Sequence, residues 1–283
     1  MIDLEFRGRV ITRGRPLVMA IINVTRDSFY DNGATFEFSA AQAAVTKALA
    51  EGADIIDIGG VRAGSAGETV DTAEEARRVV PLVTWTRQHH PDAVISVDTW
   101  RSEVAERVLD AGADLINDTW AGYDSRIVEV AGAAGAGYVC SHTGGLEPRT
   151  DPHRPMYADL IGEVIAETTA LAERAVAAGV PRRGALIDPT FDFGKNTWHS
   201  LELLRHIEDL VATGWPVLIA LSNKDFIGES LGLDDPADRV EGTLAATALA
   251  ARAGAAVFRA HNIARTRSVL DTVAAITAPP AEG

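Results

Sequence analysis

The chain has 283 residues and a hydrophobic content of 47%, enough for one large domain with a substantial core. Its formal net charge of −14 would repel nucleic-acid phosphates and anionic membranes, so we expect it to bind neither. The one cysteine, Cys140, excludes an internal disulfide framework and is typical of a reducing cytoplasm. The N-terminus has no signal-peptide pattern, and no apolar run reaches the roughly 18 residues of a membrane span. We therefore expect a soluble cytoplasmic protein.

Short apolar segments alternate with helical patterns along the chain, after a polar lead-in in which we predict no element. The apolar segments predict strands over residues 16–22, 53–58, 93–97, 114–116, 137–140, 185–187, 217–221 and 255–258. Periodicity and capping residues predict helices over residues 39–50, 72–89, 101–111, 125–134, 157–178, 200–212, 235–253 and 263–276. Ser39 and Thr72 are the expected N-caps of the first two helices. The tail from about residue 277 is expected to be frayed.

Eight strand–helix units without a domain break favour a single (β/α)₈ TIM barrel over residues 1–283. A doubly wound open sheet is the structural alternative. In either fold, ligands bind at the carboxyl ends of the strands, so the residues that follow each strand are the candidates for function.

Polar residues stand at the carboxyl ends of all eight predicted strands. These residues are Asn23, Asp57, Asp98, Asn117, His142, Asp188, Lys224 and Arg259, with His261 close behind. Any one of them could simply cap or turn a loop. Together at one barrel mouth they predict a ligand site, because buried polar groups are costly unless a ligand or mutual pairing satisfies them. Asp57 is the weakest candidate, since it and Asp54 could pair with backbone beside the strand.

The chemistry of these residues indicates the kind of ligand. Carboxylates and an amide suit the amino-pyrimidinone edge of a flat heterocycle. Lys224 and Arg259, with His261 as a further candidate cation, suit an anion or stack on a ring. The set therefore predicts a heterocycle that carries a negatively charged leaving group. The chain has no phosphate-binding loop, dinucleotide fingerprint or zinc-spaced His/Cys cluster. Trp100 and Trp120 lie just past two strand ends and are candidates to line the mouth.

Two segments resemble the signatures of dihydropteroate synthases: residues 18–33 (VMAIINVTRDSFYDNG) and residues 52–60 (GADIIDIGG). Further segments match the same family in order, namely SVDT at 96–99, IND at 116–118, DPTFDFGK at 188–195, SNKDFIG at 222–228 and RAH at 259–261. The run CSHTGG at 140–145 resembles a divergent actinobacterial branch, whose members are regarded as lacking ordinary synthase activity.

The resemblance implies a barrel that joins 6-hydroxymethyl-7,8-dihydropterin diphosphate to p-aminobenzoate in folate synthesis, with Mg²⁺ as cofactor and a homodimer as the assembly. It assigns substrate binding to Asp98, Asn117, Asp188, Phe193, Lys224, Arg259 and His261. Asp98, Lys224 and Arg259 are the expected catalytic residues, and Asn23 is the expected metal ligand. In this chemistry the metal and the cations stabilise the leaving diphosphate, and buried carboxylates favour the electron-poor pterin.

Departures from the family pattern lie on the loops. The family's arginine in the second signature is Gly64 here, with Arg62 two residues earlier, and the proline of the first signature is Arg26. A glycine of the family's sixth segment is replaced by Asp192.

The segment around Lys224 departs as well. The family's serine that contacts the p-aminobenzoate carboxylate is Asp225, and the arginine before the lysine is Asn223. A carboxylate at 225 should repel an anionic second substrate by on the order of 1 kcal/mol or more. The loss of the arginine removes an expected compensating charge.

Three functions remain open from the sequence. The first is a dihydropteroate synthase with a rearranged p-aminobenzoate site. The second is a pterin-binding protein without synthase turnover, such as a regulator or sequestering module. The third keeps the pterin but uses another acceptor, as in the pterin-binding barrels of methyltransferases. Release of diphosphate that depends on p-aminobenzoate would distinguish the first from the other two.

Overall fold

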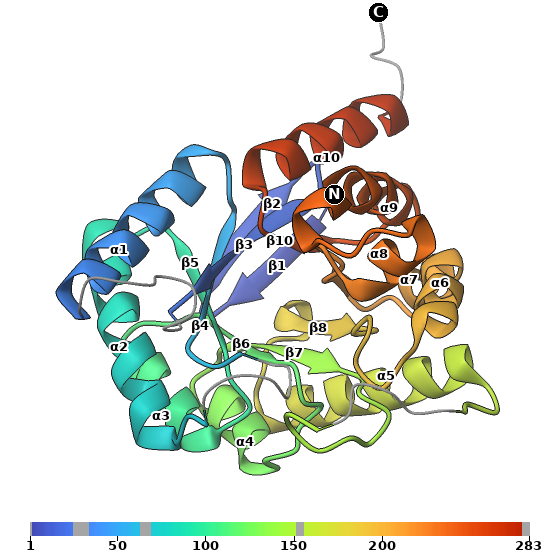
Figure 1. Ribbon diagram of the computed structural model, residues 1–283. Coiled ribbons are helices and arrows are strands. Elements are labelled where there is room, and N and C mark those ends of the chain that lie inside the picture. Colours follow the sequence, from blue (N-terminus) through green and yellow to red (C-terminus); the bar gives the residue numbers. More distant parts are fainter. Residues whose placement is uncertain (1, 25–33, 63–68, 151–155, 279–283) are drawn as a thin grey trace, which may run out of the picture.

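The computed structural model describes residues 2–24, 34–62, 69–150 and 156–278 (Figure 1). Eight parallel strands form a sheet in the order β8-β7-β6-β5-β4-β3-β10-β9, with helices around it. The strands are β3 (Leu17–Asn23), β4 (Ile55–Gly59), β5 (Val94–Asp98), β6 (Leu115–Asp118), β7 (Gly137–Ser141), β8 (Ala185–Asp188), β9 (Leu218–Ile219) and β10 (Val257–Ala260). The predicted (β/α)₈ barrel is confirmed. No helix in these ranges has the length and apolar character needed to cross a membrane.

The barrel closes between β8 and β9. Ile187 and Val217 form a parallel bridge there, and the Ile187 N–H donates to the Pro216 carbonyl at 2.9 Å. β9 itself is two residues long, shorter than the predicted strand over residues 217–221. Closure matters for function because it turns the carboxyl ends of eight strands into one ring.

The helices form the outer layer. They are α1 (Ala34–Ala50), α2 (Thr72–His89), α3 (Ser102–Asp110), α4 (Arg126–Ala133), α5 (Leu160–Ala178), α6 (Thr197–Arg205), α7 (Ile207–Ala212), α8 (Asp225–Leu231), α9 (Val240–Arg252) and α10 (Ile263–Thr277), with 3₁₀ turns η2 (Arg182–Gly184) and η3 (Pro236–Arg239). In α3, apolar side chains at Val104, Val108 and Leu109 recur at helical spacing and are buried against the sheet.

Several predicted helix boundaries are wrong. Ser39 lies inside α1, and the N-cap of α2 is Asp71, whose carboxylate accepts the Glu74 N–H at 2.8 Å, rather than Thr72. The predicted helix over residues 200–212 is two helices, α6 and α7, and α6 begins earlier, behind a capping box formed by Asn196 and His199.

The short helix α8 directly after β9 was not predicted. Its first residue is Asp225, so the segment that carries Lys224 ends in a helical turn rather than in a long loop. The N-cap of α8 is Lys224, whose side chain does not cap the helix. The sequence therefore gives only a weak signal for the start of this helix.

The N-terminal segment forms a hairpin of β1 (Ile2–Phe6) and β2 (Arg9–Arg13), so the expectation of an unstructured lead-in is wrong. Leu4, Phe6 and Ile11 join the strand side chains Leu17 and Met19 in one buried cluster, which also includes residues from the amino-terminal parts of the other strands. The hairpin therefore fills the end of the barrel opposite the carboxyl ends of the strands.

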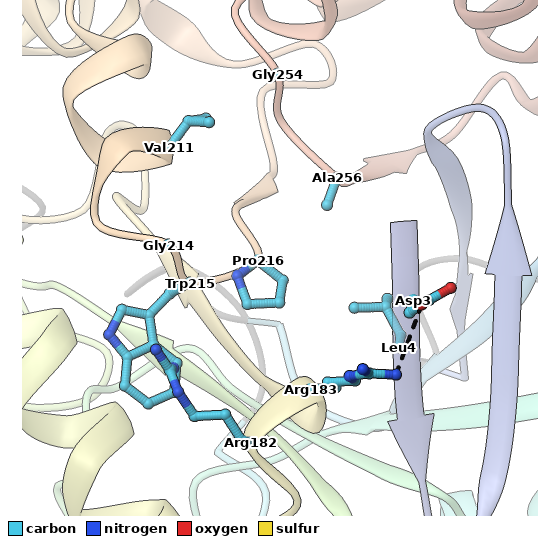
Figure 2. A pocket seen from close by; sticks show the side chains of 10 residues that line it. All are labelled: Asp3, Leu4, Arg182, Arg183, Val211, Gly214, Trp215, Pro216, Gly254 and Ala256. Carbon is cyan, nitrogen blue, oxygen red and sulfur yellow. Dashed lines mark ion pairs between the residues drawn. The ribbon is translucent and has the colours of Figure 1, made fainter. Parts of the chain in front are cut away.

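Polar contacts also tie the hairpin to the barrel, beside a surface hollow of about 340 Å³ (Figure 2). Arg183 of η2 pairs with Asp3 of β1 at 3.6 Å. Next to it, the Arg182 guanidinium lies 3.1 Å from the centre of the Trp215 ring. This end of the barrel is thus occupied by contacts that hold the fold together.

The hairpin's contribution to stability can be measured with Phe6→Ala. Phe6 is fully buried, and its ring lies so close to Gly137 that a Cβ there would come within 2.3 Å of it. We expect the free energy of unfolding in urea to fall by about 3–5 kcal/mol, because the truncation leaves a cavity. Val10→Ala, at a position in the same hairpin that is 60% exposed, is the control and should cost little. Equal effects of the two variants would show that the hairpin does not plug the barrel.

Candidate functional site

A cavity of about 300 Å³ opens at the carboxyl ends of the strands. Its lining residues are Arg62, Asp98, Asn117, Thr119, Asp188, Thr190, Phe193, Ala220, Lys224, Arg259 and His261. All seven residues expected from the sequence to bind substrate are among them. The cavity's size is at the lower end of the range for small-molecule sites.

Arg259 of β10 lies at the centre of the polar network. Its Nε donates to Asp57 Oδ2 at 2.6 Å, and its Nη2 donates to Asp98 Oδ2 at 2.9 Å. Asp57 is fully buried and also accepts from Asn117 Nδ2 at 3.0 Å and from Ser96 Oγ at 2.6 Å. The expectation that Asp57 pairs with backbone is therefore wrong. It is the carboxylate that holds Arg259 in place.

Asp98 faces the cavity with one oxygen on Arg259 and the other on the Thr119 hydroxyl, at 3.1 Å. Burial raises the pKa of Asp98 to about 7; Arg259 opposes this rise, and the neighbouring charge of Asp57 adds to it. The Asp98 carboxylate is thus only partly compensated by the protein.

Asp188, at the end of β8, is buried in the cavity wall. Burial raises the pKa of Asp188 to about 6. Two interactions lower the pKa: the hydrogen bond that the Thr190 N–H donates to Asp188 Oδ1 at 2.7 Å, and the positive charge of Lys224. Asp188 and Asp98 are therefore two desolvated carboxylates that additional hydrogen-bond donors would stabilise.

Lys224 extends across the cavity wall formed by the loop after β8. Its Nζ donates to the Phe191 carbonyl at 2.9 Å and lies 4.2 Å from the centre of the Phe193 ring. Burial lowers the pKa of Lys224, and Asp192 and Asp188 oppose that shift.

His261 is a neutral member of the site. Burial, with the charges of Arg259 and Lys224, lowers the pKa of His261 to about 4. Its Nδ1 lies 3.0 Å from Ser222 Oγ. At this pKa the ring is neutral at neutral pH, so it offers a hydrogen bond to a ligand rather than a positive charge.

Lys195 is a supporting residue to which the sequence analysis assigned no role. It is almost completely buried, and its Nζ donates to the carbonyls of His142 at 2.7 Å, Phe193 at 2.9 Å and Thr190 at 3.2 Å. These bonds hold the loop that carries Phe193 against the end of β7. The available signal was a lysine at the end of the family segment DPTFDFGK at residues 188–195.

Other predicted residues lie elsewhere. His142 does not line the cavity; its ring is buried between β7 and α5. Asn23 ends β3 beside Gly59 but is not among the lining residues. Trp120 packs edge-on against Phe193 with ring centres 5.4 Å apart, and Trp100 packs on Trp120, so both lie behind the wall of the cavity.

Among the loop departures, Arg62 reaches the cavity, whereas Arg26 and Gly64 lie outside the described residues.

Asp192 and Asp225 belong to one network at the start of α8. Asp192 Oδ2 accepts the Asp225 N–H at 2.7 Å, and Asp225 Oδ1 pairs with Arg239 Nη1 at 2.6 Å. Arg239 also donates to the Asn223 carbonyl at 3.1 Å. The expectation that Asp225 lacks a compensating charge is wrong, because Arg239 of η3 supplies it.

The raised pKa of Asp188 gives a pH-dependent prediction. The folded-state pKa of about 6 exceeds the ordinary value of 3.8, so the folded chain binds this proton more tightly than the unfolded chain. The contribution of Asp188 to stability is therefore greatest below about pH 4 and falls as the pH rises to about 6. We expect Asp188→Asn to raise the free energy of unfolding at pH 8 by on the order of 3 kcal/mol, with little change at pH 4. Urea unfolding at both pH values measures this, and an equal effect at the two would contradict it.

Comparisons with known proteins identify the family of the chain. Residues 19–261 match the family model described as "Pterin binding enzyme". "Inactive dihydropteroate synthase 2" of Mycobacterium tuberculosis is 59% identical over 273 residues, which cover 95% of this chain and 85% of the relative. The dihydropteroate synthase of Neisseria meningitidis serogroup C is 38% identical over 260 residues, which cover 90% of this chain and 91% of the relative.

A solved structure is also similar over nearly the whole chain. Dihydropteroate synthase of Xanthomonas albilineans with 4-aminobenzoic acid is 37% identical, with a TM-score of 0.90 over 98% of this chain and 99% of that one. The same enzyme in complex with 7,8-dihydropteroate gives a TM-score of 0.86 over 98% and 100%. The cavity, the motifs and these similarities lead to one conclusion: the chain belongs to the family of pterin-binding enzymes, as a homologue of dihydropteroate synthase.

Proposed function

We propose that this chain binds the pterin of 6-hydroxymethyl-7,8-dihydropterin diphosphate in the barrel cavity, and that its condensation with p-aminobenzoate is weak or absent. The observation that carries the proposal is the pair of desolvated carboxylates, Asp98 and Asp188, in a cavity that also holds Asn117 and Lys224. A pterin presents ring N–H and amino donors along one edge. Donation from that edge to these carboxylates would offset the cost of burying their charge.

The position of Arg259 also favours pterin binding in this cavity. Two carboxylates fix its guanidinium at the cavity wall, so its planar face is oriented before a ligand arrives. A guanidinium stacks on an aromatic ring more favourably than an ammonium does, because it is planar and weakly hydrated. We assign Asp98 to the face of the site where positive character would build on the pterin, and Arg259 and Lys224 to holding the pterin and stabilising the negative charge of the leaving diphosphate.

The diphosphate would lie toward Arg62, His261 and Asn23. Asn23 offers a neutral side-chain oxygen, and the neighbouring Gly59 has no side chain to fill the space beside that oxygen. This fits Mg²⁺, which prefers oxygen ligands and is held by few protein groups together with substrate phosphates. When bound, the ion would neutralise charge on the leaving diphosphate. We further propose that the chain forms a single domain, that it works in the cytoplasm and that it assembles as a homodimer, as the family resemblance implies.

The part of the site where p-aminobenzoate would bind favours weak or absent condensation with the pterin. Asp192 and Asp225 place two carboxylates next to Lys224, and one cation, Arg239, pairs with Asp225. The Xanthomonas enzyme binds 4-aminobenzoic acid, which is an anion at neutral pH. The remaining negative charge of Asp192 would oppose such a ligand, although by less than two unpaired carboxylates would.

The synthase reaction itself is the second candidate. The intact set of Asp98, Asn117, Asp188, Lys224 and Arg259 in one cavity favours it. The 59% identical relative, by contrast, carries the name "Inactive dihydropteroate synthase 2", which favours binding without turnover.

Pterin binding is tested by calorimetry with 6-hydroxymethylpterin. We expect Asp188→Ala to weaken binding by at least about tenfold, because it removes a charged hydrogen-bond acceptor in a buried site. Asp92→Ala changes an exposed carboxylate before β5, at the opposite end of the barrel, and should bind like the unmodified chain. Unchanged affinity in Asp188→Ala would refute the pocket assignment.

The charge argument is tested with Asp192→Gly combined with Asp225→Ser. Asp192 has a φ of +67°, which glycine adopts readily, so the double change should not strain the loop. We expect p-aminobenzoate to bind about fivefold or more tightly in the presence of pterin and diphosphate, with a smaller gain at high salt. Diphosphate release measured alongside shows whether turnover follows.

Asp225→Asn is the matched control for that experiment, because it removes the charge and keeps the shape of the side chain. If neither variant changes p-aminobenzoate affinity, repulsion by these carboxylates does not explain the weak or absent condensation that we propose.

A further inference from the structure

A second group of ligand-type side chains lies outside the cavity, between the end of β7 and helix α5. It consists of His142, Glu163 and Glu167, whose ligand atoms all lie within 4.8 Å of one another. His142 is fully buried, while the side chains of Glu163 and Glu167 are 25% and 51% exposed. The group is therefore buried on the imidazole side and open to solvent on the carboxylate side.

Two regular elements, β7 and α5, bring this group together. His142 directly follows β7, whose five residues are all buried, so the strand fixes its ring. Glu163 and Glu167 are four residues apart on α5 and thus lie on one face of the helix. Asp159 sets the start of that helix by accepting the Gly162 N–H at 2.9 Å.

The distances fit a shared cation better than direct hydrogen bonds. His142 Nε2 lies 3.4 Å from Glu167 Oε2 and 3.8 Å from Glu163 Oε1. Hydrogen bonds from nitrogen to oxygen are about 2.7–3.2 Å long. Ligand atoms bonded at about 2.0–2.2 Å to a tetrahedral zinc ion are separated by roughly 3.3–3.6 Å. The carboxylate oxygens of Glu163 and Glu167 lie within 4.8 Å of each other, and rotation of these partly exposed side chains would bring the three ligand atoms onto one ion.

We propose that His142, Glu163 and Glu167 form a binding site for a divalent transition metal of the zinc type. One imidazole nitrogen and two carboxylate oxygens are ligands that Zn²⁺ accepts readily, and three protein ligands leave a fourth position for water. Mg²⁺ prefers oxygen ligands alone, so this site differs in chemistry from the Mg²⁺ position proposed at Asn23. The two carboxylates also balance the charge of the ion.

The site's position gives the metal a structural role. The carbonyl of His142 accepts a hydrogen bond from Lys195, which also holds Thr190 and Phe193 of the cavity wall. A metal bound to the His142 ring and to the two glutamates of α5 would join that helix to the end of β7. Binding should therefore stabilise the folded chain without any pterin present.

The test uses the full chain, stripped of metal by a chelator and studied without pterin. Zn²⁺ titrated by calorimetry should bind with one strong site per chain, and Co²⁺ in its place should give the intense visible absorption of a four-coordinate ion. Zn²⁺ should also raise the melting temperature by several degrees, because it binds only the folded state.

The variants separate this site from others. Glu167→Gln alters a half-exposed side chain, so the chain should fold, and we expect it to weaken Zn²⁺ binding at least tenfold. His142→Ala should abolish the Co²⁺ spectrum. Glu173→Gln, at an exposed carboxylate on the same helix, should bind Zn²⁺ normally, as should Asn23→Ala and Asp188→Ala.

Absence of a one-to-one site, or equal Zn²⁺ affinity in Glu167→Gln and the unmodified chain, would overturn the proposal. Loss of Zn²⁺ binding in Asn23→Ala would likewise overturn it, because it would place the ion in the cavity. None of these outcomes depends on whether the chain binds pterin.

Discussion

The ion pairs of Arg259 with Asp57 and Asp98 are the interaction on which the site depends. They join β10, β4 and β5, and the paired residues lie 202 and 161 positions apart in sequence. A buried guanidinium without its carboxylates would be strongly unfavourable, so Arg259 depends on Asp57 and Asp98, and each carboxylate depends on Arg259. Asn117 and Ser96 complete the shell by donating to Asp57. This network holds Asp98 at the cavity, where Asp188 and Lys224 also lie.

The mouth of the barrel has two sides that differ in how closely they follow the family. On the side that we propose for the pterin, the residues that the family resemblance assigns to pterin binding line one cavity. On the other side, the loops after β8 and β9 are joined to each other through Asp192 and the Asp225 N–H, and Arg239 closes that network. A fold can be retained while its chemistry changes, because the barrel positions its loops independently of what they carry.

Much of the architecture could be predicted because apolar strands and amphipathic helices have different periods. The N-terminal hairpin was missed although its first strand alternates apolar and polar residues and is followed by Arg7-Gly8, a recognisable turn signal. Helix α8 was missed because it is short and its start has no capping side chain. The observed N-cap of α2 differs from the predicted one by a single residue, because Asp71 and Thr72 are both acceptable caps.

The sequence by itself determined which residues follow the strands and which family motifs they form, because both are local properties of the chain. Only the tertiary structure decided their partners. It turned Asp57 from a doubtful candidate into the anchor of Arg259, directed His142 away from the cavity and toward α5, and brought Arg239 to Asp225. The physical reason is that pairing depends on distance and burial in three dimensions. Residues far apart in the chain meet only when the barrel closes, and no local pattern records which of them will meet.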